Sequence, residues 1–198
     1  MKRSYRLTAL ALMAAVATTP AVAGWKLVPA QAPTAVAKGK LTVTPDSAWN
    51  RWSVRPIKKG EIWTLDGTQL NEVYFVTGLI PGETLYRDAK KKDNPLPQFR
   101  AGMQLTDLPD FFESSNRVVL NTSLFKITAV EPYRLGGHDG VKFSYEYGVD
   151  GSALIRKGIA AATVVGGQLH LISYTAPALH YFERDRAKAE ALMASAKF

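Results

Sequence analysis

Hydrophobic and polar side chains alternate most regularly in the C-terminal half of the chain. Between residues 141 and 147 every second side chain is apolar or aromatic, which is the period-two pattern of a half-buried strand. The runs 124–135, 154–165 and 168–175 are also rich in β-branched, aromatic or small apolar residues, and glycine-containing turns separate the four runs. Short turns join antiparallel neighbours, so these runs predict an antiparallel meander.

Two other stretches have the spacing of helices. The first begins near Thr106 or Asp107, has Pro109 in its first turn and ends near Arg117. The second spans 179–196, and its predicted apolar face contains Leu179, Phe182, Ala189, Met193 and Ala196. A sheet with an apolar face needs a cover. We therefore expect an α+β fold in which an antiparallel β-sheet, a meander, is covered by the C-terminal helix and a second helix, like an α/β/α sandwich.

A tryptophan-rich segment lies upstream of both predicted helices. The β-prone runs 61–65 and 73–77 flank an Asp-Gly turn signal and predict a hairpin. Three tryptophans fall in or near it, namely Trp49, Trp52 and Trp63. Aromatic side chains of this size either fill a core and cover a sheet face, or form a stacking platform for a sugar or an aromatic ligand. We consider all three tryptophans as candidate contacts for a partner.

The N-terminal 23 residues have the pattern of a secretory signal peptide. Three cations precede an apolar run at 7–17, and Ala21-Val22-Ala23 supplies the small residues of a cleavage site before Gly24. The alternative is a retained N-terminal anchor, although the apolar run is short for a membrane span. Cleavage between Ala23 and Gly24 predicts a periplasmic or secreted protein of the bacterial envelope. Residues 24–40 are then expected to form a Pro/Ala-rich arm with little structure, and 41–198 a single domain.

Composition limits the possible chemistry. The chain has 198 residues, no cysteine and a net charge of +8. The absence of cysteine excludes disulfides, thiol nucleophiles, Fe–S clusters and cysteine zinc sites. Loss of the three cations of the signal peptide lowers the net charge to +5, which is compatible with an anionic partner. The charge alone does not require one.

The stretch 78–102 is irregular in pattern and basic. It contains several prolines and glycines together with the cations Arg87, Lys90, Lys91 and Lys92. Loops of this length are usually either functional or mobile. The run is either a solvated loop or an electrostatic contact for an anionic or acidic partner. We do not expect nucleic acid, because aromatic residues are not interleaved with these cations and the chain is predicted to be exported.

Catalytic motifs are missing from the sequence. It has no G-x-S-x-G elbow, no H-E-x-x-H, no Walker phosphate loop and no dinucleotide fingerprint. The strongest metal-ligating set is weak and consists of His170, His180 and Glu183, on the predicted last strand and the start of the helix after it. We therefore predict no catalytic residues, no metal site and no cofactor.

The end of the chain carries a resemblance to a known family. The strand Leu171-Ile-Ser-Tyr-Thr-Ala-Pro177, followed by a helix that ends at Ala194-Ser-Ala-Lys-Phe198, resembles the PsbP/Mog1-like α/β/α sandwich, as does the order of predicted elements from 41 to 198. Members of that group are mostly non-enzymatic accessory or binding proteins, and several are exported. The resemblance implies the same for this chain and carries over no functional residue.

The sequence therefore favours an exported accessory or binding module without catalytic activity. Its expected partner is another envelope protein or an anionic envelope component, contacted through loops. One alternative is a small-ligand-binding protein or a hydrolase with a site between the sheet and the helices. Another is a structural role at the envelope surface.

Overall fold

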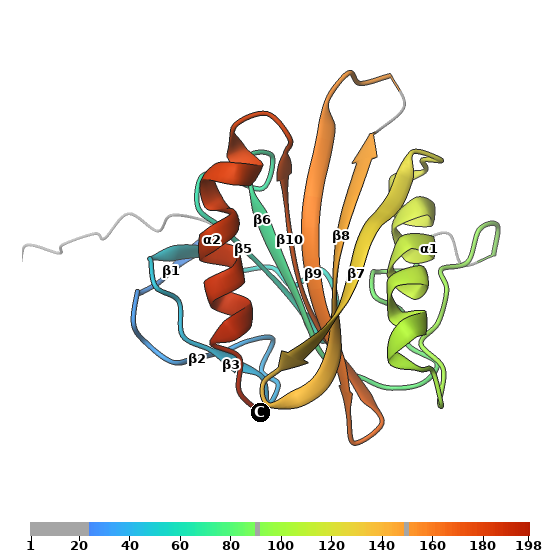
Figure 1. The fold of residues 1–198 in the computed structure, drawn as a ribbon, viewed down its shortest axis with the longest axis horizontal. Helices are drawn as coiled ribbons and strands as arrows, with labels where there is room; N and C mark the ends of the chain where they lie inside the picture. The colour runs from blue at the N-terminus through green and yellow to red at the C-terminus, as the bar shows by residue number, and fades with distance from the viewer. Residues whose placement is uncertain (1–23, 90–91, 149–150) are drawn as a thin grey trace, which may run out of the picture.

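One large antiparallel sheet lies between two helices (Figure 1). The computed structural model describes residues 24–89, 92–148 and 151–198. The sheet has eight strands in the order β1-β4-β5-β6-β10-β9-β8-β7. Their bounds are β1 Trp25–Val28, β4 Trp49–Trp52, β5 Gly60–Thr64, β6 Glu72–Leu79, β7 Phe125–Leu135, β8 His138–Gly148, β9 Ile155–Val165 and β10 Gln168–Pro177. A two-stranded sheet adds β2 Thr34–Ala35 and β3 Thr42–Val43, and the helices are the 3-10 turn η1 Leu105–Asp107, α1 Leu108–Leu120 and α2 Tyr181–Ala194.

The predicted meander is confirmed. Strands β7, β8, β9 and β10 are consecutive in sequence and adjacent in the sheet, and every pairing is antiparallel. Strand β6 then pairs with the free side of β10, which joins the meander to the β5–β6 hairpin. The expected α+β class, with an antiparallel sheet between two helices, is therefore the observed one.

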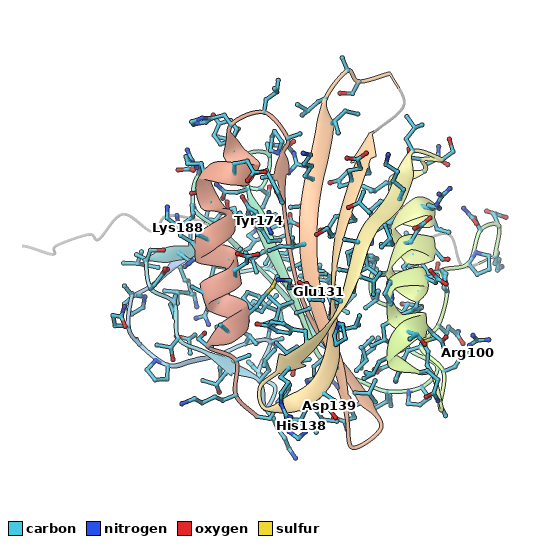
Figure 2. All side chains as sticks on the ribbon, in the orientation of Figure 1. Arg100, Glu131, His138, Asp139, Tyr174 and Lys188 are labelled. Carbon is cyan, nitrogen blue, oxygen red and sulfur yellow. The ribbon has the colours of Figure 1, made fainter. Side chains whose placement is uncertain are left out.

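Helix α2 covers one face of the sheet. Its buried side chains pack on alternate residues of β10, including Ile172 and Tyr174, as period two requires. Figure 2 shows Tyr174 behind α2 and Lys188 on the outer side of that helix. Leu179 differs from the prediction, because it precedes the first turn of α2 and is 80% exposed.

Helix α1 covers the opposite face. Phe112 is the centre of this second core, with its ring 5.3 Å from Phe143 and 5.1 Å from Tyr145. Pro109 lies in the first turn, where no backbone donor is required, and Asn121 ends the helix in the left-handed conformation at φ 49°. The sheet therefore carries one apolar core on each face.

Residues 24–40 are part of the fold, whereas the sequence predicted an arm with little structure. Strand β1 is an edge strand of the large sheet, paired with β4 from Trp25↔Trp52 to Val28↔Trp49. Val36 is completely buried in the α2-side core. The composition of this stretch suggested a linker because it contains Pro29, Pro33 and many alanines. The burial of its apolar residues depends on partners more than 20 residues away.

The irregular stretch between β6 and η1 is held against the body of the protein. Its described residues form no helix or strand, yet Leu85, Leu96 and Phe99 are buried. The Tyr86 ring stacks on Tyr74 of β6 with centroids 5.3 Å apart. Apolar anchors at intervals therefore fix a loop that has no regular hydrogen-bonding pattern.

Candidate functional site

A basic pocket opens beside the β1–β4 edge of the sheet. Its volume is about 530 Å³, within the range of small-ligand sites. We call it the basic pocket, and its lining residues are Lys26, Ala35, Lys38, Arg51, Trp52, Ser53, Arg55 and Glu61. They come from β1, from the segment around β2, from β4 and the residues after it, and from β5. The pocket therefore depends on the N-terminal segment lying against the sheet.

Strand pairing sets two of its cations side by side. Lys26 of β1 is directly opposite Arg51 of β4 in the antiparallel register. Like charges at directly opposite positions repel each other, so this pairing costs free energy on its own. Arg51 is in turn paired with Trp63 of β5, and Glu61, two residues before Trp63, lies on the same side of the sheet. This register therefore places the Glu61 carboxylate next to the two cations.

The carboxylate of Glu61 forms the floor of the pocket. Glu61 is only 3% exposed, and its Oε1 lies 3.7 Å from a guanidinium nitrogen of Arg51. The indole N–H of Trp63 donates to Oε1 over 2.7 Å, and the backbone N–H of Ala37 donates to Oε2 over 2.9 Å. A buried charge needs such partners. Glu61 therefore has a structural role: it fixes residue 37, and with it this side of the pocket.

The remaining cations have no carboxylate counterpart in the structure. Among the described residues, Lys26, Lys38 and Arg55 make no ion pair within 4.0 Å. The lining therefore combines four cations with a single carboxylate, and that carboxylate is already hydrogen-bonded. Converging charges of one sign raise the local concentration of the opposite ion, and guanidinium and ammonium groups are strong donors to phosphate and carboxylate oxygens.

An aromatic pair borders the same pocket. Trp25 of β1 and Trp52 of β4 stack with ring centroids 6.4 Å apart and an interplanar angle of 26°. Both rings are half-buried, and Trp52 also lines the pocket. Since successive strand residues point to opposite sides of the sheet, the Trp52 ring lies on the other face from Arg51, and it packs against the α1-side core.

The structure separates the three tryptophans predicted as contacts. Trp49 and Trp63 are completely buried in the α2-side core, so neither ring is available to a partner. Both point to the inner face of their strands, and the Trp63 ring packs against Phe75 at 4.8 Å. Only Trp52 remains a candidate contact. The sequence could not distinguish the three, because burial here depends on which face of β4 or β5 each residue occupies.

The described residues of the predicted basic loop do not line this pocket. Arg87 lines a separate cavity of about 290 Å³ together with Lys58 and Lys59, where Lys59 is already paired with Glu83 at 2.6 Å. Lys92 is exposed, and Lys90 and Lys91 lie outside the described residues. Of the loop cations that the structure describes, neither Arg87 nor Lys92 lines the pocket that contains Trp52.

The weak metal candidates are far apart. His170 lies near the start of β10 and His180 after its end, and strand residues advance by about 3.3 Å each, which separates the two by roughly 25 Å. No group of three metal-ligating side chains occurs within the described ranges. The two histidines are close in sequence, but they lie at opposite ends of a ten-residue strand.

The imidazole of His170 has a structural environment. Its Nδ1 accepts the backbone N–H of Gly78 at 3.2 Å and lies 3.0 Å from the hydroxyl of Thr77, while its ring meets Phe198 edge-on at 4.5 Å. Burial, with smaller contributions from nearby His138 and Lys40, lowers the pKa of this imidazole to about 4. The side chain is therefore neutral near pH 7.

Charged side chains elsewhere do not converge in this way. A larger hollow of about 650 Å³ lies between the loop and the start of α1, but there Arg100 is opposed by Asp107 and Asp110. His138 and Asp139 lie at the β7–β8 turn near the C-terminus (Figure 2), where Asp139 is 3.5 Å from Arg134.

Within the described part of the chain, no helix is long and apolar enough to cross a membrane.

Comparison with known proteins gives similarity of fold only. No family model matches the chain, and no curated protein sequence matches it. Among solved structures, it is similar to cyanobacterial PsbP (CyanoP) from Synechocystis sp. PCC 6803, with a TM-score of 0.39 and 13% identity over 88% of this chain and 81% of that one. It is also similar to LpqN, involved in cell envelope biogenesis of Mycobacterium tuberculosis, with a TM-score of 0.38 and 10% identity over 87% of this chain and 90% of that one. Both TM-scores are below 0.5, and neither structure transfers a function to this chain.

Proposed function

We propose that this chain is an exported, non-catalytic binding module whose basic pocket holds the phosphate group of an anionic envelope component. One observation supports this most directly: Lys26, Lys38 and Arg55 line a single pocket and have no ion-pair partner among the described residues. Charged groups that are not paired within the protein keep their donors free for a ligand.

The dimensions of the pocket fit a small ligand or a headgroup. A volume of about 530 Å³ accommodates a sugar phosphate. The same phosphate chemistry occurs in soluble sugar phosphates and in lipid headgroups. A binding experiment must therefore include both sources.

Calorimetric titration with glucose 6-phosphate tests the soluble source, with glucose as the neutral control. Cosedimentation with phosphatidylglycerol vesicles tests the lipid source, with phosphatidylcholine vesicles as the neutral control. We expect binding to at least one anionic probe and to neither neutral one. Raising the salt concentration is expected to weaken that binding, because exposed charges are screened over about 10 Å at 0.1 M salt.

Three matched double variants locate the contact. The variant Lys26→Ser/Arg55→Ser removes two pocket cations, Arg87→Ser/Lys92→Ser removes two loop cations, and Lys157→Ser/Lys197→Ser removes two cations from neither region. We expect a loss of at least tenfold in affinity for the first variant only. Loss of affinity in the loop variant alone would overturn the pocket assignment. Equal loss of affinity in all three variants would show that the interaction depends only on the net charge of the protein.

The main competing function is capture of another protein through the loop. Pull-down from envelope extracts with the same variants distinguishes it from the proposal. A protein partner that is retained by the pocket variant and lost by the loop variant, with no binding of either anionic probe, would favour an accessory protein of the kind that the PsbP/Mog1-like resemblance implies.

A further inference from the structure

The first residues of the edge strand lie beside the basic pocket. The backbone carbonyl of Gly24 accepts a hydrogen bond from the N–H of Ser53 at 2.8 Å, and Ser53 lines the pocket. The next residue, Trp25, begins β1, and its ring stacks on the pocket residue Trp52. Two independent contacts therefore fix where the chain enters the fold.

The nitrogen of Gly24 must then lie close to the pocket. Within one residue the backbone nitrogen and oxygen are separated by at most about 3.6 Å, so the Gly24 nitrogen lies within roughly 6–7 Å of the Ser53 nitrogen. Gly24 adopts φ +107°, a conformation that side chains rarely allow, and a Cβ placed there would meet no atom within 4 Å. The surroundings of Gly24 are therefore open.

The sequence places the signal cleavage site immediately before this residue. Cleavage between Ala23 and Gly24 would convert a neutral amide nitrogen into a free α-amine, which ordinarily has a pKa of about 7.7–8.0 and is mostly charged at pH 7. The new charge would stand within about one Debye length of a pocket that already contains Lys26, Lys38, Arg51 and Arg55.

We infer that the α-ammonium group of Gly24, released by signal-peptide cleavage, is a fifth cationic group of the basic pocket, so that export completes the anion site. This inference rests on the proposed function, because it assigns a further contact to the same pocket. The precursor keeps a neutral amide at this position and binds the anion more weakly. The mature chain therefore binds the anion more tightly than the precursor does.

The test compares two forms of the same protein that begins at Gly24, one with a free α-amine and one acetylated selectively at that amine. Each is titrated with glucose 6-phosphate at pH 7 and at pH 9. We expect the free form to bind about threefold more tightly at pH 7, the order of one additional charge at this distance in a solvated site. The difference should disappear at pH 9, where the amine is neutral.

The pH dependence identifies the group. The second pKa of a phosphate monoester is about 6, so the ligand keeps its charge between pH 7 and 9. Ordinary lysine, arginine and glutamate side chains, the charged types that line the pocket, do not titrate in this interval. Loss of affinity between pH 7 and 9 in the free form alone therefore reports the α-amine.

The possible outcomes separate the two proposals. If both forms bind equally at pH 7, the α-amine is not part of the site, while the pocket itself remains supported. If neither form binds glucose 6-phosphate or phosphatidylglycerol vesicles, the proposed function fails and this inference fails with it. If Lys26→Ser/Arg55→Ser abolishes binding in both forms, the pocket is confirmed and the comparison of free and acetylated chains alone decides the inference.

Discussion

The aromatic ring of Tyr145 on β8 lies directly over Gly158, the residue opposite it on β9. A Cβ at position 158 would overlap this ring. The tyrosine is also fixed at its far end, where its hydroxyl donates to the Tyr174 carbonyl at 3.2 Å. The absence of a side chain at 158 therefore allows Tyr145 to cross β9 and reach β10.

Replacement of Gly158 by alanine is expected to destabilise the fold by about 2–3 kcal/mol, because an overfilled core forces side chains out of their preferred rotamers. The measurement is the free energy of unfolding from urea titration. Gly148→Ala is the matched control in the neighbouring strand, where the new Cβ would meet Ile155 and Leu124 at an ordinary 3.4 Å. Equal effects of the two substitutions would contradict the close packing inferred at Gly158.

Glu61→Gln is expected to lower the free energy of unfolding by about 2 kcal/mol. The amide has one acceptor oxygen in place of two, so either the Trp63 indole or the Ala37 N–H loses its partner, and Arg51 loses its counter-charge. The effect is limited because the Arg51 side chain is 32% exposed and partly solvated. Thermal and urea unfolding both measure this change.

A second glutamate provides the control for that substitution. Glu146 forms a 2.7 Å pair with Lys126, whose side chain is 66% exposed. Glu146→Gln is expected to change stability by less than about 0.5 kcal/mol, as is usual for surface ion pairs. If Glu61→Gln were equally mild, the carboxylate would not be the anchor of residue 37 that its contacts indicate.

The fold was predictable where the sequence pattern is long. The runs in β7 to β10 have ten or more residues each and are separated by short glycine-containing turns, and β8 alternates strictly at 141–147, so both the strands and their antiparallel order follow from local information. Leu179 shows the limit of the same reasoning at an element boundary. It continues the helical spacing in sequence, but the helix begins only at Tyr181, and the side chain stays in solvent.

The basic pocket was not predictable, because its parts are assembled by pairing. Lys26 and Arg51 are 25 residues apart in sequence and become neighbours only through the β1–β4 register. Strand β1 has four residues, too few for a clear alternation. Glu61 is a charged residue that the sequence places at the start of a strand, and nothing local shows that its carboxylate is buried. A tryptophan-rich segment next to several cations was the only signal in the sequence that pointed to this region.

The buried imidazole of His170 predicts a loss of stability in acid. Its pKa in the folded protein is about 4, below the ordinary value of 6.5, so the unfolded chain binds the proton more readily. The contribution of His170 to the free energy of unfolding is therefore fully present above pH 6.5. It is lost as the pH falls from 6.5 to 4, by up to about 3 kcal/mol. The measurement is the free energy of unfolding across this interval.

Two asparagine variants isolate that contribution. His170→Asn removes the titrating group, so the stability of the variant relative to the parent is expected to increase as the pH falls from 6.5 to 4.5, whatever its effect on absolute stability. His180→Asn is the control at an exposed site. An unchanged slope in His170→Asn would show that the acid sensitivity comes from other groups.

The buried carboxyl of Glu72 has the opposite effect, because it predicts a loss of stability as the pH rises. Burial raises the pKa of its carboxyl to about 7, and the Arg156 guanidinium only partly offsets this. The folded protein therefore holds the proton more tightly than the unfolded chain, and the resulting stability is present below pH 4.5 and lost as the pH rises to 7.

Glu72→Gln replaces this carboxyl with a neutral group of the same shape, so we expect the variant to be more stable than the parent above pH 7, by about 2 kcal/mol. Urea unfolding at pH 5 and pH 8 measures the difference, with Glu146→Gln as the control for loss of a charge. Equal stability of the Glu72 variant and the parent at pH 8 would mean that the carboxylate ionises in the fold without cost. The slopes of His170 and Glu72 oppose each other between pH 4.5 and 6.5, so these two groups together place the stability maximum in that interval.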